Sequence, residues 1–135
     1  MEECIFCKII NGEIPSSKVY ENDKVIAFLD IAPVNKGHTL VVPKEHHKDI
    51  MDTPDNILAE TIKAVKKVAK AVMKATGAEG FNLGVNNGKI AGQLVMHLHF
   101  HIMPRFENDG LKLWPGRKYE GNEIDEIAKK ISSLL

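Results

Sequence analysis

Three histidines, His97, His99 and His101, alternate with apolar residues along one short segment. Successive side chains of a β-strand point to opposite faces, so this spacing predicts a strand over residues 94–103 that carries all three imidazoles on one face. The apolar residues of the alternation would enter the core on the other face: Leu98, Phe100 and Ile102. Three imidazoles on one face are a candidate site for metal binding or catalysis, which a single histidine would not be.

Two kinds of chemistry use imidazoles in this arrangement. Three neutral imidazoles can hold a catalytic zinc ion with water as the fourth ligand. Alternatively, one imidazole can act as a nucleophile toward phosphorus while its second ring nitrogen is fixed by a hydrogen bond. The loop over residues 86–93 contains Gly88 and Gly92, whose lack of side chains lets backbone amides approach phosphate oxygens. Since no carboxylate adjoins the three histidines in sequence, phosphoryl transfer is favoured and catalytic zinc is kept as the alternative.

Cys4 and Cys7 are the two cysteines of the chain and stand three residues apart. The longest apolar runs are too short for a signal-peptide core or a membrane span, so we expect a cytosolic protein. In a reducing compartment, two cysteines at this spacing indicate metal ligands or a redox pair rather than a structural disulfide. A pair of reduced, buried thiols is a further alternative.

The composition limits both the size and the partners of the protein. At 135 residues, 44% of them hydrophobic, the chain is long enough for one domain with its own core and too short for several. Its 18 basic and 18 acidic residues give a net charge of zero. This balance argues against a nucleic-acid polymer or an anionic membrane as the partner, and it is compatible with a small phosphorylated ligand.

The elements that must position the histidines can be predicted from the spacing of apolar residues. Residues 4–11 indicate a short helix, and residues 18–20 and 25–29 indicate a β-hairpin. Further strands are predicted over residues 39–42, 81–85 and 94–103. Strand runs without regular βαβ alternation favour an α+β domain with a mainly antiparallel sheet.

The clearest helix is predicted between Thr53 and Gly77. We expect Thr53 to cap its N-terminus, Pro54 to occupy its first position and Gly77 to end it. Its apolar stripe would consist of Leu58, Ile62, Val65, Ala69 and Val72. Its solvated face would carry Lys63, Lys66, Lys67, Lys70 and Lys74. A terminal helix is predicted over residues 122–135, with one apolar face formed by Ile124, Ile127, Ile131 and Leu134.

Taken together, these motifs resemble the histidine triad (HIT) family. The similarity is carried by residues 92–105, which contain the three histidines, and by residues 5–10, 28–31 and 37–44. These segments follow one another in family order over most of the chain. The sequence is most similar to the Hint-like branch, and the pair of cysteines is similar to its zinc-bearing microbial subgroup.

The resemblance implies both a fold and an activity. The fold would be a single HIT domain over residues 1–135, with a mainly antiparallel five-stranded sheet, one long helix and shorter terminal helices. Its core would span about residues 4–105, followed by a C-terminal tail and helix over 106–135. The activity would be that of a homodimeric nucleotide hydrolase or transferase that cleaves nucleoside phosphoramidates, or related purine nucleotidyl conjugates, at the α-phosphate. A covalent nucleotidyl-histidine intermediate would form.

The resemblance also implies roles for the residues that would handle phosphate. His99 would be the nucleophile, and His101 would hydrogen-bond the α-phosphate. Asn86, together with the backbone of Gly92 and Gln93, would complete the phosphate cradle.

The remaining substrate contacts are implied in the same way. Asp30 would accept both ribose hydroxyls, which suits a carboxylate because it offers acceptors only. His38 would support the triad. The base would lie in an apolar slot whose residues the sequence alone would assign to the core: Ile5, Phe6, Ile9, Phe28, Leu29 and Ile31. Vertebrate Hint-like proteins have a serine where this chain has Leu94, so only a backbone amide would remain there for the leaving group.

In the zinc-bearing subgroup, the ligands would be Cys4, Cys7, His46 and His97. Two thiolates and two imidazoles are a common set for a closed structural zinc site. His47 is the competing ligand, and we prefer His46 for its match to the family position. A redox pair of the thioredoxin kind is less favoured, because the strand expected before it is missing.

Three other functions remain open at this point. A dinucleoside polyphosphate hydrolase of the Fhit branch would share Gln93 and the Pro104-Arg105 ending. A metallohydrolase would place catalytic zinc on the three histidines. A non-enzymatic nucleotide-sensing protein would bind nucleotide without turnover. Trp114, in the irregular tail, would either reach the site of a dimer partner or anchor its loop onto its own core.

Overall fold

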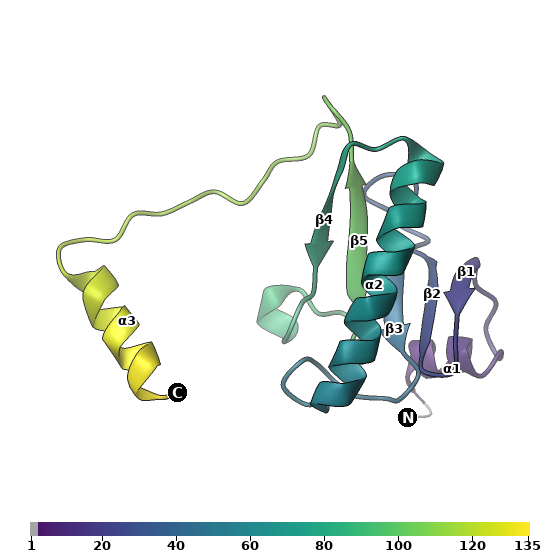
Figure 1. Cartoon of the computed structure of the whole chain (residues 1–135), viewed down its shortest axis with the longest axis horizontal. Coiled ribbons are helices and arrows are strands. Elements are labelled where there is room, and N and C mark those ends of the chain that lie inside the picture. Colours follow the sequence, from purple (N-terminus) through teal and green to yellow (C-terminus); the bar gives the residue numbers. More distant parts are fainter. Residues whose placement is uncertain (1–2) are drawn as a thin grey trace.

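Alternating and continuous apolar runs build a five-stranded sheet in residues 3–135, the part of the chain that this computed structural model describes (Figure 1). In chain order the strands are β1 Lys18–Glu21, β2 Val25–Leu29, β3 Thr39–Pro43, β4 Gly80–Gly84 and β5 Phe100–Arg105. They lie side by side in the order β1-β2-β3-β5-β4, and every neighbouring pair is antiparallel. The predicted α+β class with an antiparallel sheet is therefore confirmed.

A helix covers each face of the central strands. The long helix α2, Asp55–Thr76, lies across one face in Figure 1. Its buried residues pack there against Val25, Val41 and Ile102. On the opposite face the short helix α1, Ile5–Ile10, buries Phe6 among Ile26, Phe28, Leu40 and Val42. Covering both faces explains why β2 and β3 are almost continuously apolar, and each large side chain buried in this way contributes about 1.5 to 3 kcal/mol.

The ends and the buried stripe of α2 differ in detail from the prediction. Gly77 ends the helix in a left-handed conformation, as expected. Thr53 does not cap the N-terminus: Pro54 holds the capping position, and the buried Thr53 hydroxyl donates to the carbonyl oxygen of Asp49 at 2.6 Å. Ile62 is 45% exposed, because the buried stripe runs through its neighbour Thr61 instead.

The strand that carries the histidines is shorter than the predicted 94–103. β5 begins only at Phe100, and residues 95–97 form a bend. Within that region the backbone N–H of Leu98 donates to the carbonyl oxygen of His47, at 2.7 Å, instead of entering the sheet ladder. The alternation of faces nevertheless continues through the bend, since the three expected core residues are all buried: Leu98, Phe100 and Ile102.

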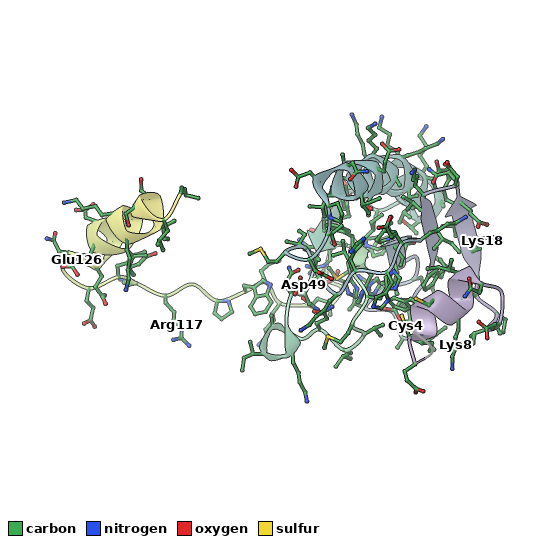
Figure 2. The ribbon with its side chains drawn as sticks, turned by 90° about the horizontal axis from the view of Figure 1, so that it is seen from below. Cys4, Lys8, Lys18, Asp49, Arg117 and Glu126 are labelled. Atoms are coloured by element: carbon green, nitrogen blue, oxygen red, sulfur yellow. The ribbon has the colours of Figure 1, made fainter. Side chains whose placement is uncertain are left out.

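Residues 106–135 form an arm that leaves the body of the molecule. After β5, Arg105 pairs with Asp109 at 2.8 Å, and the chain then runs out to helix α3, Glu123–Ser133. Figure 2 shows Arg117 and Glu126 on this arm, well away from the body. Every residue from 110 to 135 is exposed, including the predicted apolar face of α3. In the described residues no helix is both long and apolar enough to span a bilayer.

Candidate functional site

A cavity of about 420 Å³ opens between α1, the end of β2 and the start of β5. Twelve of the residues predicted to touch substrate or to act in catalysis line it: Ile5, Phe6, Ile9, Phe28, Leu29, Asp30, Ile31, Asn86, Gly92, Leu94, His99 and His101. The turn at residues 14–16 lines it too, and no sequence motif had indicated this. A second cavity of about 400 Å³, between α2 and β1, has no histidine, cysteine or carboxylate in its lining. The residues expected to contact substrate therefore gather at the first cavity.

Strand register brings the polar residues of this cavity together. Phe28 of β2 lies opposite Leu40 of β3, and Leu40 lies opposite His101 of β5. Asp30 follows the end of β2 and His38 precedes β3, so both approach His101 from the neighbouring strands.

The ring of His99 is held with one nitrogen free. Its Nδ1 lies 2.7 Å from the carbonyl oxygen of His97. A carbonyl can only accept, so Nδ1 carries the proton and Nε2 keeps its lone pair. Burial lowers the pKa of His99, which keeps this ring neutral near pH 7. A neutral imidazole with an unprotonated Nε2 beside a cavity has the form that a nucleophile requires.

His38 fixes the opposite tautomer in His101. The backbone N–H of Val34 donates to His38 Nδ1 at 3.1 Å, so the proton of the neutral ring is on Nε2. That Nε2 donates to His101 Nδ1 at 2.9 Å, which places the His101 proton on its own Nε2. In the described part of the chain, His101 Nε2 is the one buried side-chain nitrogen or oxygen that lacks a hydrogen-bond partner. This N–H is therefore a donor that no protein acceptor pairs with.

Burial, the neighbouring histidines and Asp30 together determine the charge of this cluster. Burial, ahead of the repulsion by His99 and His38, lowers the pKa of His101 to about 4. Asp30 lies close enough to oppose that shift, with its Oδ2 3.6 Å from His38 Nε2 and its Oδ1 accepting from the N–H of Ala32 at 2.9 Å. The cavity thus presents two neutral imidazoles and one carboxylate.

The loop over residues 86–93 forms a further wall. Gly88 and Gly92 both have a φ of +96°, a conformation that a side chain would strain, and Asn86 Nδ2 donates to the Gly92 carbonyl oxygen at 3.3 Å. The side chain of Gln93 is 1% exposed and does not line the cavity. Its amide oxygen accepts from the N–H of Gly88 at 2.9 Å, and its amide nitrogen donates to the carbonyl oxygen of Lys48 at 2.6 Å. The Gln93 side chain therefore holds the loop in place. The backbone N–H of Gln93 donates to the carbonyl oxygen of Gly88 at 3.1 Å, and that of Gly92 donates to the carbonyl oxygen of Lys89 at 3.0 Å. The expectation that these two amides complete a phosphate cradle is therefore wrong.

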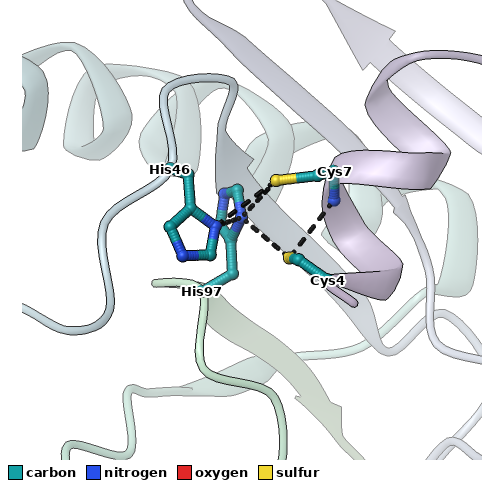
Figure 3. Close-up of side chains that lie close together, drawn as sticks. All are labelled: Cys4, Cys7, His46 and His97. Carbon is teal, nitrogen blue, oxygen red and sulfur yellow. Dashed lines mark hydrogen bonds between the residues drawn. The ribbon is translucent and has the colours of Figure 1, made fainter. Parts of the chain in front are cut away.

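Four side chains converge beside this cavity, as Figure 3 shows. Cys4 Sγ lies 3.4 Å from His97 Nδ1, Cys7 Sγ lies 3.3 Å from His46 Nδ1, and the two Nδ1 atoms are 3.0 Å apart. Ligands around a tetrahedral zinc ion are about 3.3 to 3.8 Å from one another, given bond lengths of about 2.0 to 2.3 Å. His97 Nε2 donates to the Pro43 carbonyl oxygen at 2.8 Å, which leaves its Nδ1 lone pair for a metal. The donor set therefore fits zinc.

The protonation of these four groups also suits a metal. Burial lowers the pKa of His97 to about 4 and lowers that of His46, so both rings are neutral donors. Burial and the neighbouring Cys4 raise the pKa of the Cys7 thiol to about 11, so this thiol holds its proton unless a cation displaces it. His47 points elsewhere and lies 3.0 Å from Glu45 Oε1, which favours His46 over it as the fourth ligand.

The alternative of a catalytic zinc on His97, His99 and His101 is not supported. Among residues 3–135, the groups of side chains close enough to share a metal are Cys4, Cys7, His46 and His97, and separately Asp30, His38 and His101. The bend before β5 turns the His97 ring toward the cysteines, so that the three histidines never converge on one point.

Comparison with known proteins gives a consistent result. The HIT domain family matches residues 11–108. An uncharacterized HIT-like protein of Methanocaldococcus jannaschii is 53% identical, over 95% of this chain and 98% of its own. The adenosine 5′-monophosphoramidase of Schizosaccharomyces pombe is 46% identical over 98% of each chain.

Solved structures agree with these sequence matches. A HIT family protein from Bacillus subtilis superposes with a TM-score of 0.91 at 42% identity, over 98% of this chain and 97% of its own. A zinc-bound histidine triad protein from Mycobacterium smegmatis reaches 0.79 at 34% identity, over 98% of both chains. The predicted HIT fold is thereby confirmed, and the chain belongs to the HIT domain family.

Proposed function

We propose that this protein is a nucleotide hydrolase that cleaves purine nucleoside phosphoramidates, or related nucleotidyl conjugates, at the α-phosphate. The observation that carries the proposal is the pair of opposite tautomers at the cavity, with a free lone pair on His99 Nε2 and a proton on His101 Nε2. One ring is set to attack phosphorus and the other to donate to a phosphate oxygen. The similarity to an adenosine 5′-monophosphoramidase supports this class of substrate.

In the proposed reaction the His99 lone pair forms a bond to phosphorus. The phosphorus–nitrogen bond of the substrate breaks, and the leaving amine takes that electron pair and a proton from solvent. The attacked imidazole becomes positively charged, and its Nδ1–H remains on the His97 carbonyl oxygen, which stabilises the charge. Water then attacks the phosphorus and loses a proton to solvent, the electron pair of the bond to phosphorus returns to His99 Nε2, and a nucleoside monophosphate leaves.

Substrate binding would divide between the two ends of the cavity. Asp30, at the end of β2, would accept the ribose hydroxyls, and the apolar residues around Phe28 would hold the base. At the other end, the Asn86 side chain would contact the phosphate, beside the loop wall at Gly92. The exposed Leu94 adds an apolar surface where the leaving group would emerge.

We also propose that Cys4, Cys7, His46 and His97 hold a structural zinc ion. Their donor atoms all lie within 4.8 Å of one another, and a structure with 34% sequence identity is described as zinc-bound. The metal would displace the thiol protons and join α1 to the segment that follows β3 and the segment that precedes β5. Cysteines that serve as reduced ligands are compatible with the cytosol, where we expect the protein to reside.

We further propose a homodimer in which the arm of each copy packs on the other. The arm spans more than a fifth of the chain, so the TM-score of 0.91 requires that most of it superposes on the solved B. subtilis structure. If both proteins extend the arm in the same way, its apolar face needs a partner surface on another molecule. Acidic residues open α3 (Glu123, Asp125 and Glu126), while α2 exposes five lysines, which makes a second copy a complementary partner.

The nucleophile can be tested by substitution. His99→Ala should reduce turnover of adenosine 5′-phosphoramidate at least about a thousandfold. Binding of adenosine monophosphate, measured by calorimetry, should persist because the Asp30 end of the cavity is untouched. His47→Ala is the matched control, since its ring lies outside both clusters. Full turnover by the His99 variant would remove His99 from the nucleophile role.

The competing functions separate in one comparison. Rates on adenosine phosphoramidate and on diadenosine polyphosphates should differ in favour of the phosphoramidate, whereas a polyphosphate hydrolase would reverse the order. A nucleotide sensor would turn over neither substrate and would give no burst of nucleotidyl-enzyme on rapid mixing.

A further inference from the structure

We infer that the Cys4, Cys7, His46, His97 cluster, when it holds metal, positions the ring of His99 for attack, so that its occupancy sets the rate of the chemical step. The inference rests on the proposed function, because it assigns His99 as the nucleophile. The cluster and the cavity are joined by three contacts, each of which starts at a proposed ligand or at its neighbour in the chain.

The first contact runs through His97 itself. Its ring is fully buried and is held at both nitrogens, by the Pro43 carbonyl oxygen at Nε2 and by the cluster at Nδ1. The carbonyl oxygen of the same residue accepts the Nδ1–H of His99 at 2.7 Å. One residue thus offers its side chain to the cluster and its backbone to the nucleophile. Any rotation of the His97 backbone would release the bond that fixes the His99 tautomer.

The second contact fixes the backbone between these two histidines. Residues 97–99 precede β5, and the pairing of β3 with β5 includes no residue before Phe100. The sheet therefore does not hold this segment. Instead the N–H of Leu98 donates to the carbonyl oxygen of His47 at 2.7 Å, next to the proposed ligand His46. Each of the two segments that make this contact carries a proposed ligand next to it, His46 or His97. The cluster therefore holds this backbone in place where no strand pairing does.

The third contact comes from α1. Phe6 lies between the two cysteines in sequence, is buried, and places its ring edge-on to His99 with centroids 4.9 Å apart at 86°. The same ring meets His97 at 6.0 Å. When Cys4 and Cys7 are fixed by a common ion, the Phe6 ring is fixed in its perpendicular contact with His99. His99 is then held by a hydrogen bond at Nδ1 and by an aromatic contact with Phe6.

Without metal the same atoms are held less tightly. Without a metal, the two thiols contact the imidazoles only through weak sulfur contacts of 3.3 to 3.6 Å, and one contact of 3.0 Å joins the two Nδ1 atoms. The His97 carbonyl oxygen would then sample positions away from His99 Nδ1. Misplacing a reacting group by about 1 Å costs roughly a hundredfold in rate, whereas nucleotide binding depends mainly on β2 and the glycine loop.

The test compares zinc-loaded protein with protein stripped by a chelator, both at pH 8. We expect kcat on adenosine phosphoramidate to fall roughly ten- to a hundredfold on stripping, with the Kd for adenosine monophosphate changed less than about threefold and both effects reversed by added zinc. Side-chain ¹⁵N spectra should report one His99 tautomer, protonated at Nδ1, in the loaded protein and a mixture in the stripped one. An unchanged tautomer and kcat in folded, stripped protein would overturn the inference.

A variant that keeps all four ligands covers the case in which stripping unfolds the chain. Phe6→Leu should retain one zinc per chain yet lower kcat and broaden the His99 ¹⁵N signals. Ile10→Ala, in the same helix but away from the cavity, is the matched control and should do neither. A Phe6→Leu variant with an unchanged kcat and a single His99 tautomer would contradict the positioning role.

The outcomes also separate this inference from the proposed function. If His99→Ala remains active, the nucleophile assignment fails whatever the metal does. If no zinc binds to purified, reduced protein, the metal proposal fails and the inference fails with it. If zinc binds and His99 is essential, but the stripped protein and Phe6→Leu both keep full kcat, only the inference fails.

Discussion

At the scale of single residues, backbone atoms decide which ring nitrogen carries the proton in His38, His97 and His99. The carbonyl oxygens of Pro43 and His97 accept from His97 and His99, and the N–H of Val34 donates to His38. These partners act through backbone atoms, whose contacts the pattern of side chains in the sequence does not reveal. The sequence predicted the histidines of the site, because residue type and spacing are visible in it. It could not predict their tautomers, which depend on contacts between distant segments.

Removing His38 should leave the His101 ring without a fixed tautomer. In His38→Ala, His101 Nδ1 loses its donor at 2.9 Å, so the ring can hold its proton on either nitrogen. We expect kcat to fall about tenfold, with adenosine monophosphate binding preserved. Steady-state kinetics would measure the effect, with His47→Ala as the control. An unchanged kcat would show that His101 needs no partner.

The half-buried His101 should also make stability depend on pH. Its pKa is lowered to about 4 in the folded chain, mainly by burial, from an ordinary value near 6.5. The unfolded state therefore takes up a proton first, so the stability from this group is complete above about pH 6.5 and is lost as the pH falls toward 4. Urea unfolding of the wild type should weaken more steeply over that window than unfolding of His101→Asn. Parallel profiles would assign the loss to other groups.

At the scale of elements, the period of two predicted the faces but not the limits of the strand. Leu98, Phe100 and Ile102 are buried as expected, while the ladder starts only at Phe100. A bend at residues 95–97 preserves the alternation while it turns the His97 ring toward α1. Apolar spacing does not record whether a backbone N–H pairs within a sheet or with a loop. For the same reason Thr53 resembled a helix cap in sequence, although its hydroxyl bonds back to Asp49.

The junction between α2 and β3 gives a test of packing between elements. At Gly37, where φ is +95°, an added Cβ would lie 2.5 Å from Thr76 Cγ2 in the last turn of α2. Gly12 also has a positive φ, +79°, but nothing within 4 Å. Both substitutions to alanine carry backbone strain, so the clash should make Gly37→Ala the more destabilising by roughly 1 to 3 kcal/mol. Chemical unfolding measures the difference, and equal losses would mean that Thr76 moves aside.

At the scale of the whole molecule, the body buries its apolar side chains and the arm leaves its own exposed. The buried residues lie in the body, where sheet and helices cover one another. The arm has an amphipathic helix whose apolar face meets nothing else within residues 3–135. Sequence periodicity predicted this helix and its face. It could not predict that the face would stay uncovered, because the same pattern suits packing on its own core or on another chain.

The arm offers a matched pair of substitutions for the proposed dimer. Ile131→Asp places a charge on the apolar face of α3, and Ser132→Asp places the same charge one residue away. The first should weaken association about tenfold or more, the scale expected from losing one buried aliphatic side chain, and the second should have little effect. Sedimentation across a concentration series measures both. Equal behaviour of the two variants would exclude the apolar face from the interface.

Trp114, the one tryptophan of the chain, stands 95% exposed in the irregular part of the arm. This excludes the expectation that it anchors its loop onto its own core. Its indole emits in water while the arm is free, and contact with a second body would shift that emission to shorter wavelength. The protein therefore contains a native optical probe for the proposed dimer, which can be read by dilution without any label and alongside turnover in the same cuvette.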